Sequence, residues 1–145
     1  MTIHIVKLSV GTESVEDLAR WQASRRASNK RDTGREEHFH TTRMVPKRQD
    51  EVLDGGSIYW VIKGVILARQ RILRLDEVRG QDGILRCALV LDPDLRRTEP
   101  VPRRPFQGWR YLEPGETPRD LPKARANEPG LPPRLMAALA EIGVR

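Results

Sequence analysis

Cysteine, aromatic residues and long apolar runs are all scarce in this chain of 145 residues. The single cysteine, Cys87, excludes an internal disulfide and is typical of a reducing compartment, so we expect a cytoplasmic protein. No window approaches the roughly 18 apolar residues of a membrane-spanning helix, so we expect no membrane partner. Residues 1–7 lack the basic and apolar regions of a signal peptide, and we expect no cleaved leader.

Sequence patterns of catalysis are also missing. There is no glycine loop followed by Lys-Ser or Lys-Thr, and Ser57 lacks the surroundings of a nucleophile elbow. Cys87 alternates with leucines, which predicts a buried and unreactive thiol. We therefore expect no enzymatic activity and no cofactor. A small hydrolase or base-modifying enzyme that uses His38 or His40 is kept as an alternative.

Positive charge is abundant and unevenly distributed. The chain has 26 Lys and Arg against 20 Asp and Glu, for a net charge of +6. Between Leu18 and Arg48 there are nine basic and three acidic residues, a surplus of six that equals the net charge of the whole chain. Such clustering favours an acidic partner, above all a nucleic acid. A generally arginine-rich composition explains the same surplus without any partner.

The fold is argued from residues 45–67. Pro46 suits the first position of a short helix, and Gly55 and Gly56 suit its end. Residues 57–62 are the densest β-branched and aromatic run in the chain, which predicts a buried strand. Gly64 then predicts a bulge or sharp bend.

The remaining elements follow from periodicity and turn residues. We expect further strands over 2–10, 38–45, 65–78, 84–91 and 106–112. A capping box formed by Ser14 and Asp17 predicts a helix over 15–27, with Val15, Leu18, Ala19 and Trp21 on its apolar side. The charged residues 28–37 predict a loop, and the prolines between 93 and 105 predict an irregular, partly polyproline segment.

These elements predict an α+β fold. We expect a small curved or closed, mostly antiparallel β-barrel with two short helices at its ends. We expect one domain over residues 1–112, a proline-rich extended tail over 113–133 and a short helix over 134–143. The tail and last helix are the basis of the main alternative function, a module for protein interaction or homo-oligomerisation.

Two histidines form the first candidate site. His38 and His40 lie two residues apart on a predicted strand, so both imidazoles point to one side and are suited to a shared metal. No cysteine cluster or carboxylate on that side supplies further ligands, so we expect no metal and a partly exposed polar strand edge.

A basic segment forms the second candidate site. A strand that leads into a helix N-terminus is a favourable place for an anion, because free backbone N–H groups point toward it. The expected phosphate contacts are Arg43, Lys47, Arg48 and Lys63. The alternative is a solvated basic edge.

Aromatic residues form the third candidate site. If the last strand lies near the central one, Tyr59, Trp60 and Trp109 gather into a surface on which bases stack. Side chains that read base edges flank the last strand: Arg103, Arg104, Gln107 and Arg110. Packing in the core is the alternative role of these aromatic residues.

Four blocks resemble those of an uncharacterised bacterial family of unknown function, over about residues 1–122. They are residues 40–44 (His-Thr-Thr-Arg-Met), 55–64 (Gly-Gly-Ser-Ile-Tyr-Trp-Val-Ile-Lys-Gly), 69–72 (Arg-Gln-Arg-Ile) and 103–112 (Arg-Arg-Pro-Phe-Gln-Gly-Trp-Arg-Tyr-Leu). This resemblance implies no activity.

A second, looser resemblance is to the PUA-like barrels, including their ASCH branch. It lies in a strand and a short helix that ends in Leu53-Asp54-Gly55-Gly56, followed by a long strand. The resemblance implies a barrel that binds RNA or modified bases in a groove between helix and barrel. The ASCH pattern places Lys and Glu soon after the glycines, whereas Ser57 and Ile58 follow here. Together with the charge, it favours non-catalytic binding of RNA rather than DNA.

Overall fold

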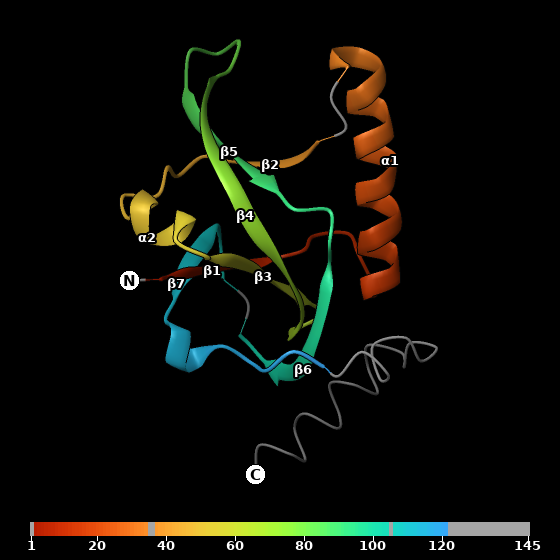
Figure 1. Cartoon of the computed structure of the whole chain (residues 1–145), viewed down its shortest axis with the longest axis vertical. Coiled ribbons are helices and arrows are strands. Elements are labelled where there is room, and N and C mark those ends of the chain that lie inside the picture. The colour runs from red at the N-terminus through yellow and green to blue at the C-terminus, as the bar shows by residue number, and fades with distance from the viewer. Residues whose placement is uncertain (1, 35–36, 105, 122–145) are drawn as a thin grey trace.

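The computed structural model describes residues 2–34, 37–104 and 106–121. Its elements (Figure 1) are β1 (His4–Leu8), α1 (Val15–Thr33), β2 (His38–Thr42), α2 (Gln49–Leu53), β3 (Ser57–Ile62), β4 (Val65–Arg79), β5 (Leu85–Leu91), β6 (Arg96–Pro102), β7 (Trp109–Leu112) and the 3-10 turn η1 (Pro114–Glu116). The expectation of an α+β fold is confirmed. The helix predicted over 134–143 and most of the predicted tail lie outside the described residues.

The strands of this part of the chain form one curved sheet. Its order is β2-β5-β4-β3-β1-β7, and β6 pairs with the first part of β4. All the pairings are antiparallel except that of β1 with β3. The expectation of a closed barrel is wrong, because no ladder joins the end strands β2 and β7 in the described residues. Side chains of β7 instead form hydrogen bonds with the backbone of residues 44–48, the segment after β2.

The turn between β3 and β4 is tighter than the sequence indicated. Lys63 and Gly64 both have positive φ, 51° and 81°, and the ladder closes with Ile62 opposite Val65. This is a two-residue hairpin turn, in which glycine relieves the strain of left-handed backbone. The chain therefore reverses at Gly64. The bends of the sheet lie within β4, where the register shifts beside β6 and again between Ile72 and Arg74.

Helix α1 is longer than predicted and buries a different side. It starts at the Ser14 N-cap, as expected, and continues to Thr33, where Gly34 ends it with a φ of 79°. Its buried positions are Val15, Leu18 and Gln22, whereas Trp21 is 49% exposed. The predicted apolar side was wrong at Ala19 and Trp21, which are exposed, because a polar residue, Gln22, takes the inward position.

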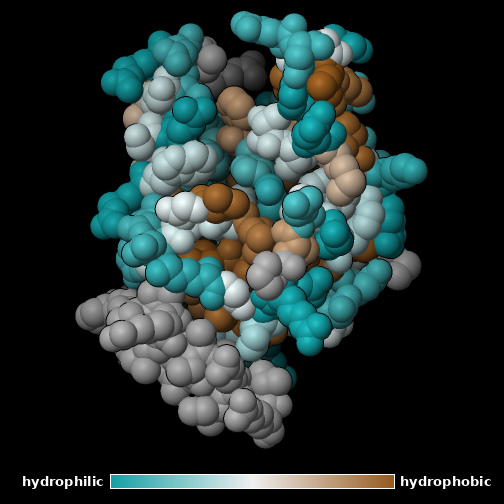
Figure 2. All heavy atoms as spheres, turned by 180° about the vertical axis from the view of Figure 1, so that it is seen from behind, coloured by the Kyte–Doolittle hydropathy of each residue, from teal (hydrophilic) through white to brown (hydrophobic). Residues whose placement is uncertain are grey.

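Both faces of the sheet carry apolar residues. The larger core lies on the face that α1 and α2 cover and includes Ile5, Ile58, Leu89, Leu18 and Val52. A smaller cluster on the opposite face includes Val6, Tyr59 and Val61. Other hydrophobic side chains stay exposed toward the end of the β4–β5 hairpin (Figure 2): Leu73, Val78, Ile84 and Leu85.

Strand β6 was not predicted, because its segment contains Pro100 and Pro102. Proline is tolerated in an edge strand, where a missing N–H leaves no internal bond unmade. A short extended segment lies along β6. Glu99 N donates to Arg119 O and Leu121 N donates to Arg97 O. Residues 119–121, expected to belong to an extended tail, thus lie against the sheet in the structure.

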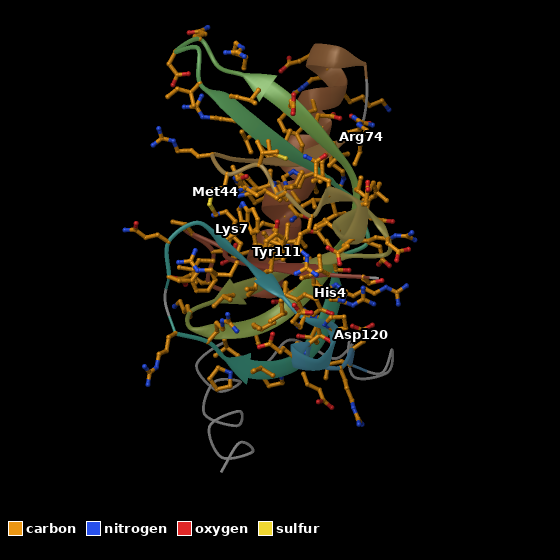
Figure 3. The ribbon with its side chains drawn as sticks, turned by 90° about the vertical axis from the view of Figure 1, so that its left-hand side faces the viewer. His4, Lys7, Met44, Arg74, Tyr111 and Asp120 are labelled. Atoms are coloured by element: carbon orange, nitrogen blue, oxygen red, sulfur yellow. The ribbon has the colours of Figure 1, made fainter. Side chains whose placement is uncertain are left out.

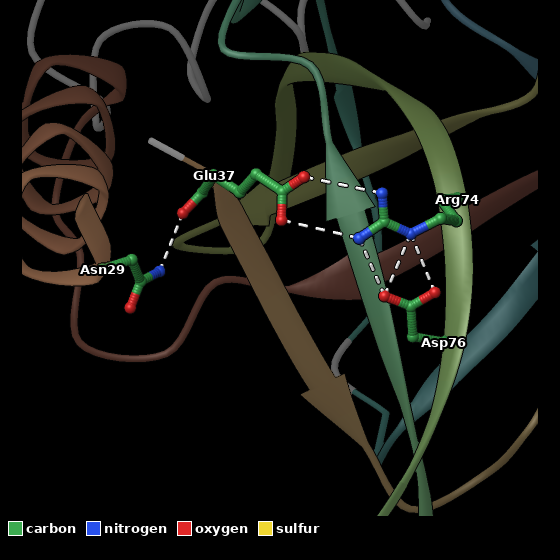
Figure 4. A network of polar contacts seen from close by, with 4 residues as sticks. All are labelled: Asn29, Glu37, Arg74 and Asp76. Carbon is green, nitrogen blue, oxygen red and sulfur yellow. Dashed lines mark hydrogen bonds and ion pairs between the residues drawn. The ribbon is translucent and has the colours of Figure 1, made fainter. Parts of the chain in front are cut away.

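A hydrogen bond and an ion pair through Glu37, the residue before β2, link α1 to β4 (Figure 4). The Arg74 guanidinium lies 2.8 Å from an Asp76 oxygen and 3.5 Å from a Glu37 oxygen. The Asn29 amide of α1 donates to Glu37 O over 2.7 Å. Arg74 is about half exposed, so these pairs stabilise the fold only modestly.

Candidate ligand pocket beside helix α1

A pocket of about 370 Å³ lies between α1 and the sheet. Strands β1, β2 and β3 contribute Lys7, His40 and Trp60, and α1 contributes Leu18 and Trp21. The loop of residues 8–12, which joins β1 to α1, completes the lining. A volume of this size is typical of small-molecule sites.

The sheet register explains why these side chains meet. Lys7 is the partner of Trp60 across the parallel β1–β3 pair and of Trp109 across the β1–β7 pair, so the three side chains share one face. His40 is paired with Leu89 of the core and therefore points to the same interior. His40 and Lys7 both line the pocket, although their strands are not neighbours in the sheet.

Aromatic rings form much of the wall. The His40 and Trp60 rings meet edge to face with centroids 5.4 Å apart, and the Trp21 and His38 rings do the same at 5.4 Å. Trp60 is only 3% exposed, whereas half of Trp21 is open to solvent. The pocket thus has one fixed aromatic wall and one aromatic residue at its mouth.

Lys7 carries an uncompensated charge. Burial lowers the pKa of its ammonium group, and no carboxylate forms an ion pair with it in the described part of the chain. An ammonium group offers three donors and no acceptor. A ligand with an exposed lone pair therefore suits this position.

His38 is buried, His40 is half-buried, and both imidazoles are neutral. Burial, and after it the charge of Lys7, lowers the pKa of His40 to about 4. Burial, followed by the charges of His40, Arg26 and Arg25, lowers the pKa of His38 to about 4. Three buried ring nitrogens have no hydrogen-bond partner within the described residues: Nδ1 and Nε2 of His38, and Nε2 of His40. The expectation of a partly exposed edge is wrong for His38, which is 1% exposed.

No metal centre is assembled in the described residues, since they contain no group of three or more His, Cys, Asp or Glu side chains placed to hold an ion. His38 and His40 do point the same way, as predicted. The two histidines lack a third metal ligand on the neighbouring strand, where their partners are Leu91 and Leu89.

The aromatic residues of the predicted binding groove are divided between the two faces of the sheet. Trp60 and Trp109 are 3% and 4% exposed in the larger core, and Tyr59 is 4% exposed in the smaller cluster. Trp60 is the residue of this set that reaches the pocket. Stacking of a base on Tyr59 or Trp109 stays a prediction, and in this structure their rings are packed against protein.

The predicted phosphate contacts differ in how free they are. Arg43 and Lys47 are exposed and have no ion-pair partner in the described residues. Arg48 pairs with Glu51 at 2.9 Å and with Glu113 at 3.6 Å, and Lys63 lies 3.7 Å from Glu13. Arg43 and Lys47 are therefore the members of this set best suited to phosphate.

The expected anion position at the start of α2 is occupied by a side chain of the protein. The Tyr111 hydroxyl accepts from Lys47 N at 3.0 Å and from Arg48 N at 3.1 Å. Nearby, Trp109 Nε1 donates to Met44 O over 3.1 Å. Lys7, Met44 and Tyr111 accordingly lie in one region of Figure 3. These bonds bridge β7 to the segment after β2 where the sheet stays open.

The remaining predicted residues lie near Phe106. The guanidinium groups of Arg103 and Arg110 lie 5.7 and 5.5 Å from the Phe106 ring centre. Arg104 and Gln107 are exposed. Phe106 packs on the smaller cluster, so this group lies on the face of the sheet opposite the pocket.

Sequence reasoning missed Lys7, Trp21 and residues 8–12 as parts of a site. One signal was present, because Lys7 interrupts the apolar side of a strand that begins with Ile3 and Ile5. A cation in such a position is buried at a cost unless it has a function or a partner.

Comparison with known proteins gives one match. A family model described as "Protein of unknown function (DUF1489)" matches residues 5–145. No curated protein and no solved structure is significantly similar to the chain. Within the described residues, neither helix has the length and apolar character needed to cross a bilayer.

Proposed function

The chain therefore belongs to this family of unknown function, and we propose that it binds RNA without catalysing a reaction. The observation that carries the proposal is a set of exposed basic side chains on α1 and after β2 that have no ion-pair partner in the described residues: Arg25, Lys30, Arg31, Arg43 and Lys47. An unpaired cation contacts a phosphate without first losing an acidic neighbour.

The position of these residues supports the proposal. Arg25 lies one helical turn after Trp21, so it is next to the mouth of the pocket. Arg43 precedes Met44, whose carbonyl accepts from Trp109 beside Lys7. Basic residues thus lie on two sides of the pocket. An RNA strand that passes over the pocket requires such residues on both sides to contact its phosphates.

The test measures binding of a fluorescent single-stranded RNA 12-mer at 50 and 200 mM salt. The variant Arg25→Ala/Lys30→Ala/Arg31→Ala removes three exposed charges, unpaired within the described residues, along α1 from Arg25 near the pocket to the last turn of the helix. The matched control Arg71→Ala/Arg79→Ala/Arg119→Ala removes three exposed charges elsewhere. We expect the first variant to bind at least tenfold more weakly and to flatten the salt slope by about 2, since each lost phosphate contact contributes about 0.7.

The control is expected to lose much less affinity, because its charges lie away from the pocket. Equal losses in both triple variants, or wild-type binding that does not fall between 50 and 200 mM salt, would refute the proposal. The alternative of a protein-interaction module depends on residues 122–145, which lie outside the described residues, and it stays a prediction.

A further inference from the structure

We propose that the pocket beside α1 holds one unpaired base of the bound RNA and that Lys7 selects a base with a keto oxygen. The inference rests on the proposed function and deepens it. It concerns the ring that enters the pocket, whereas the basic residues around the mouth hold the backbone.

The walls of the pocket suit a flat, uncharged ring. Trp60 is held in the wall by a hydrogen bond from its Nε1 to Gln70 Oε1 at 2.8 Å, and His40 meets it edge to face. Trp21 at the mouth leaves half of its surface free, although it is a large aromatic side chain on a well-formed helix. Aromatic side chains placed in this way stack on bases of any sequence.

The lining of the pocket excludes a phosphate from its interior. Lys7 is the one cation among the described residues that line it. Directly after the lining loop come Glu13, Glu16 and Asp17, and each of these carboxylates forms an ion pair, with Lys63, Arg97 and Arg20 respectively. A phosphodiester group would lose its hydration against the largely apolar and aromatic walls with Lys7 as its single cationic partner there, so the part of the ligand that enters is the neutral base.

Polar groups inside the pocket determine which base fits. The Lys7 ammonium has donors to offer and no ion-pair partner in the described residues, and Nε2 of His40 is buried without a hydrogen bond. Guanine, uracil and cytosine carry a keto oxygen that accepts from an ammonium group, whereas the acceptors of adenine are ring nitrogens alone and its exocyclic amino group is a donor that an ammonium group opposes. Lys7 therefore favours keto-bearing bases over adenine.

The test isolates one ring on a constant backbone. Three fluorescent 12-mers consist of abasic ribose spacers and carry at the centre inosine, adenosine or a further spacer. Inosine and adenosine differ at the purine C6 position, which carries a keto oxygen in one and an amino group in the other. For the wild-type protein we expect tightest binding with inosine, about tenfold tighter than with adenosine.

Two substitutions assign the effect to the pocket. Lys7→Met keeps the length of the side chain and removes its donors, so inosine should fall to the affinity of adenosine while the all-spacer strand changes less than threefold. Trp21→Ala should remove most of the additional affinity that a strand with inosine or adenosine has over the all-spacer strand. Phe39→Ala, which removes an exposed aromatic residue outside the pocket, should change none of the three affinities. Circular dichroism checks folding, and Lys7→Gln replaces Lys7→Met if that variant is unfolded.

Each result has one meaning. If no strand binds in a salt-dependent way, the proposed function fails and the inference fails with it. If all three strands bind equally, RNA binding stands and the base pocket is refuted. If Lys7→Met weakens all three strands by the same factor, Lys7 contacts the backbone and the keto selection is refuted.

Discussion

Gln22 of α1 and Gln70 of β4 exchange two hydrogen bonds between their side-chain amides in the interior of the protein. Each Nε2 donates to the Oε1 of the other, over 2.7 and 2.6 Å, and both residues are 1% exposed. Gln70 also accepts from Trp60 Nε1 at 2.8 Å and donates to Asp92 O at 3.0 Å. One buried amide thus fixes the helix, the wall of the pocket and the end of β5.

Replacement of Gln70 is expected to destabilise the protein strongly. Gln70→Leu leaves the Gln22 amide, the Trp60 N–H and the Asp92 carbonyl buried without this partner, which costs about 3 kcal/mol in the free energy of unfolding. Gln22→Leu removes one member of the pair and should cost about 1–2 kcal/mol, since Gln70 keeps two partners. Urea unfolding followed by tryptophan fluorescence measures both.

The exposed Gln81→Ala is the matched control and should change stability by less than about 0.5 kcal/mol. If Gln70→Leu is as stable as the wild type, the network does not hold α1 to the sheet.

Stability is also expected to depend on pH through His38 and His40. Both have a folded-state pKa of about 4, below the ordinary value of 6.5, so the unfolded chain binds more protons between these values. The stabilisation is complete above about pH 6.5 and is lost as the pH falls toward 4. A shift of this size corresponds to about 3 kcal/mol for each imidazole.

The free energy of unfolding, measured by urea titration at steps between pH 7 and pH 4, gives the slope. His38→Leu should flatten it by about half, because His38 is buried against Trp21 and cannot be protonated without exposing it. A slope that is the same in this variant and in the wild type would assign the pH dependence to other groups.

What could be predicted from the sequence was local. The N-cap at Ser14, the glycine turn at Asp82-Gly83 and the buried strand at 57–62 were all visible, because neighbouring residues determine them. The α+β class followed from the order of these elements. The order of the elements did not indicate that the sheet stays open, because closure depends on whether the end strands pair with each other.

The errors came from tertiary contacts. Gln22 reads as a surface residue until Gln70, 48 positions away, supplies its partner. Strand β6 was not predicted because it contains prolines, which have no N–H to donate. Proline is tolerated there because β6 lies at the edge of the sheet, where that N–H is not needed for a ladder bond. The pocket was missed because Lys7, His40 and Trp21 come from three elements whose meeting depends on register.

The bridge across the open side of the sheet leads to a third prediction. Tyr111→Phe removes the oxygen that accepts from Lys47 N and Arg48 N, and it leaves the ring that packs 4.8 Å from Trp109. We expect a loss of about 1 kcal/mol in stability, because both N–H groups can reach water.

Hydrogen exchange followed by NMR gives the specific readout for this bridge. The amides of Lys47 and Arg48 should exchange at least tenfold faster in Tyr111→Phe, while amides in the centre of β3 keep their rates. Unchanged exchange at the two amides would show that the hydroxyl does not protect them.

The fourth prediction concerns Gly56, where α2, the segment before β1 and β4 come together. Its N–H donates to Val52 O and its carbonyl accepts from Ile72 N, over 2.9 and 3.0 Å. A Cβ added there would lie 2.2 Å from Val52 O and 2.4 Å from Ile3 O, which are backbone atoms that cannot rotate away. Gly56→Ala should therefore destabilise the protein by more than about 3 kcal/mol.

Two other glycines separate crowding from backbone strain. Gly55 has a φ of 80° and no atom within 4 Å of an added Cβ, so Gly55→Ala should cost about 1 kcal/mol through its left-handed backbone alone. Gly115 is equally open without a positive φ, so Gly115→Ala should be close to neutral. Urea unfolding of the three variants should rank them in this order. If Gly56→Ala costs no more than Gly55→Ala, the close approach of α2 to residue 3 is not a constraint on the fold, and the position of α2 beside β1 is less tightly fixed than these contacts indicate.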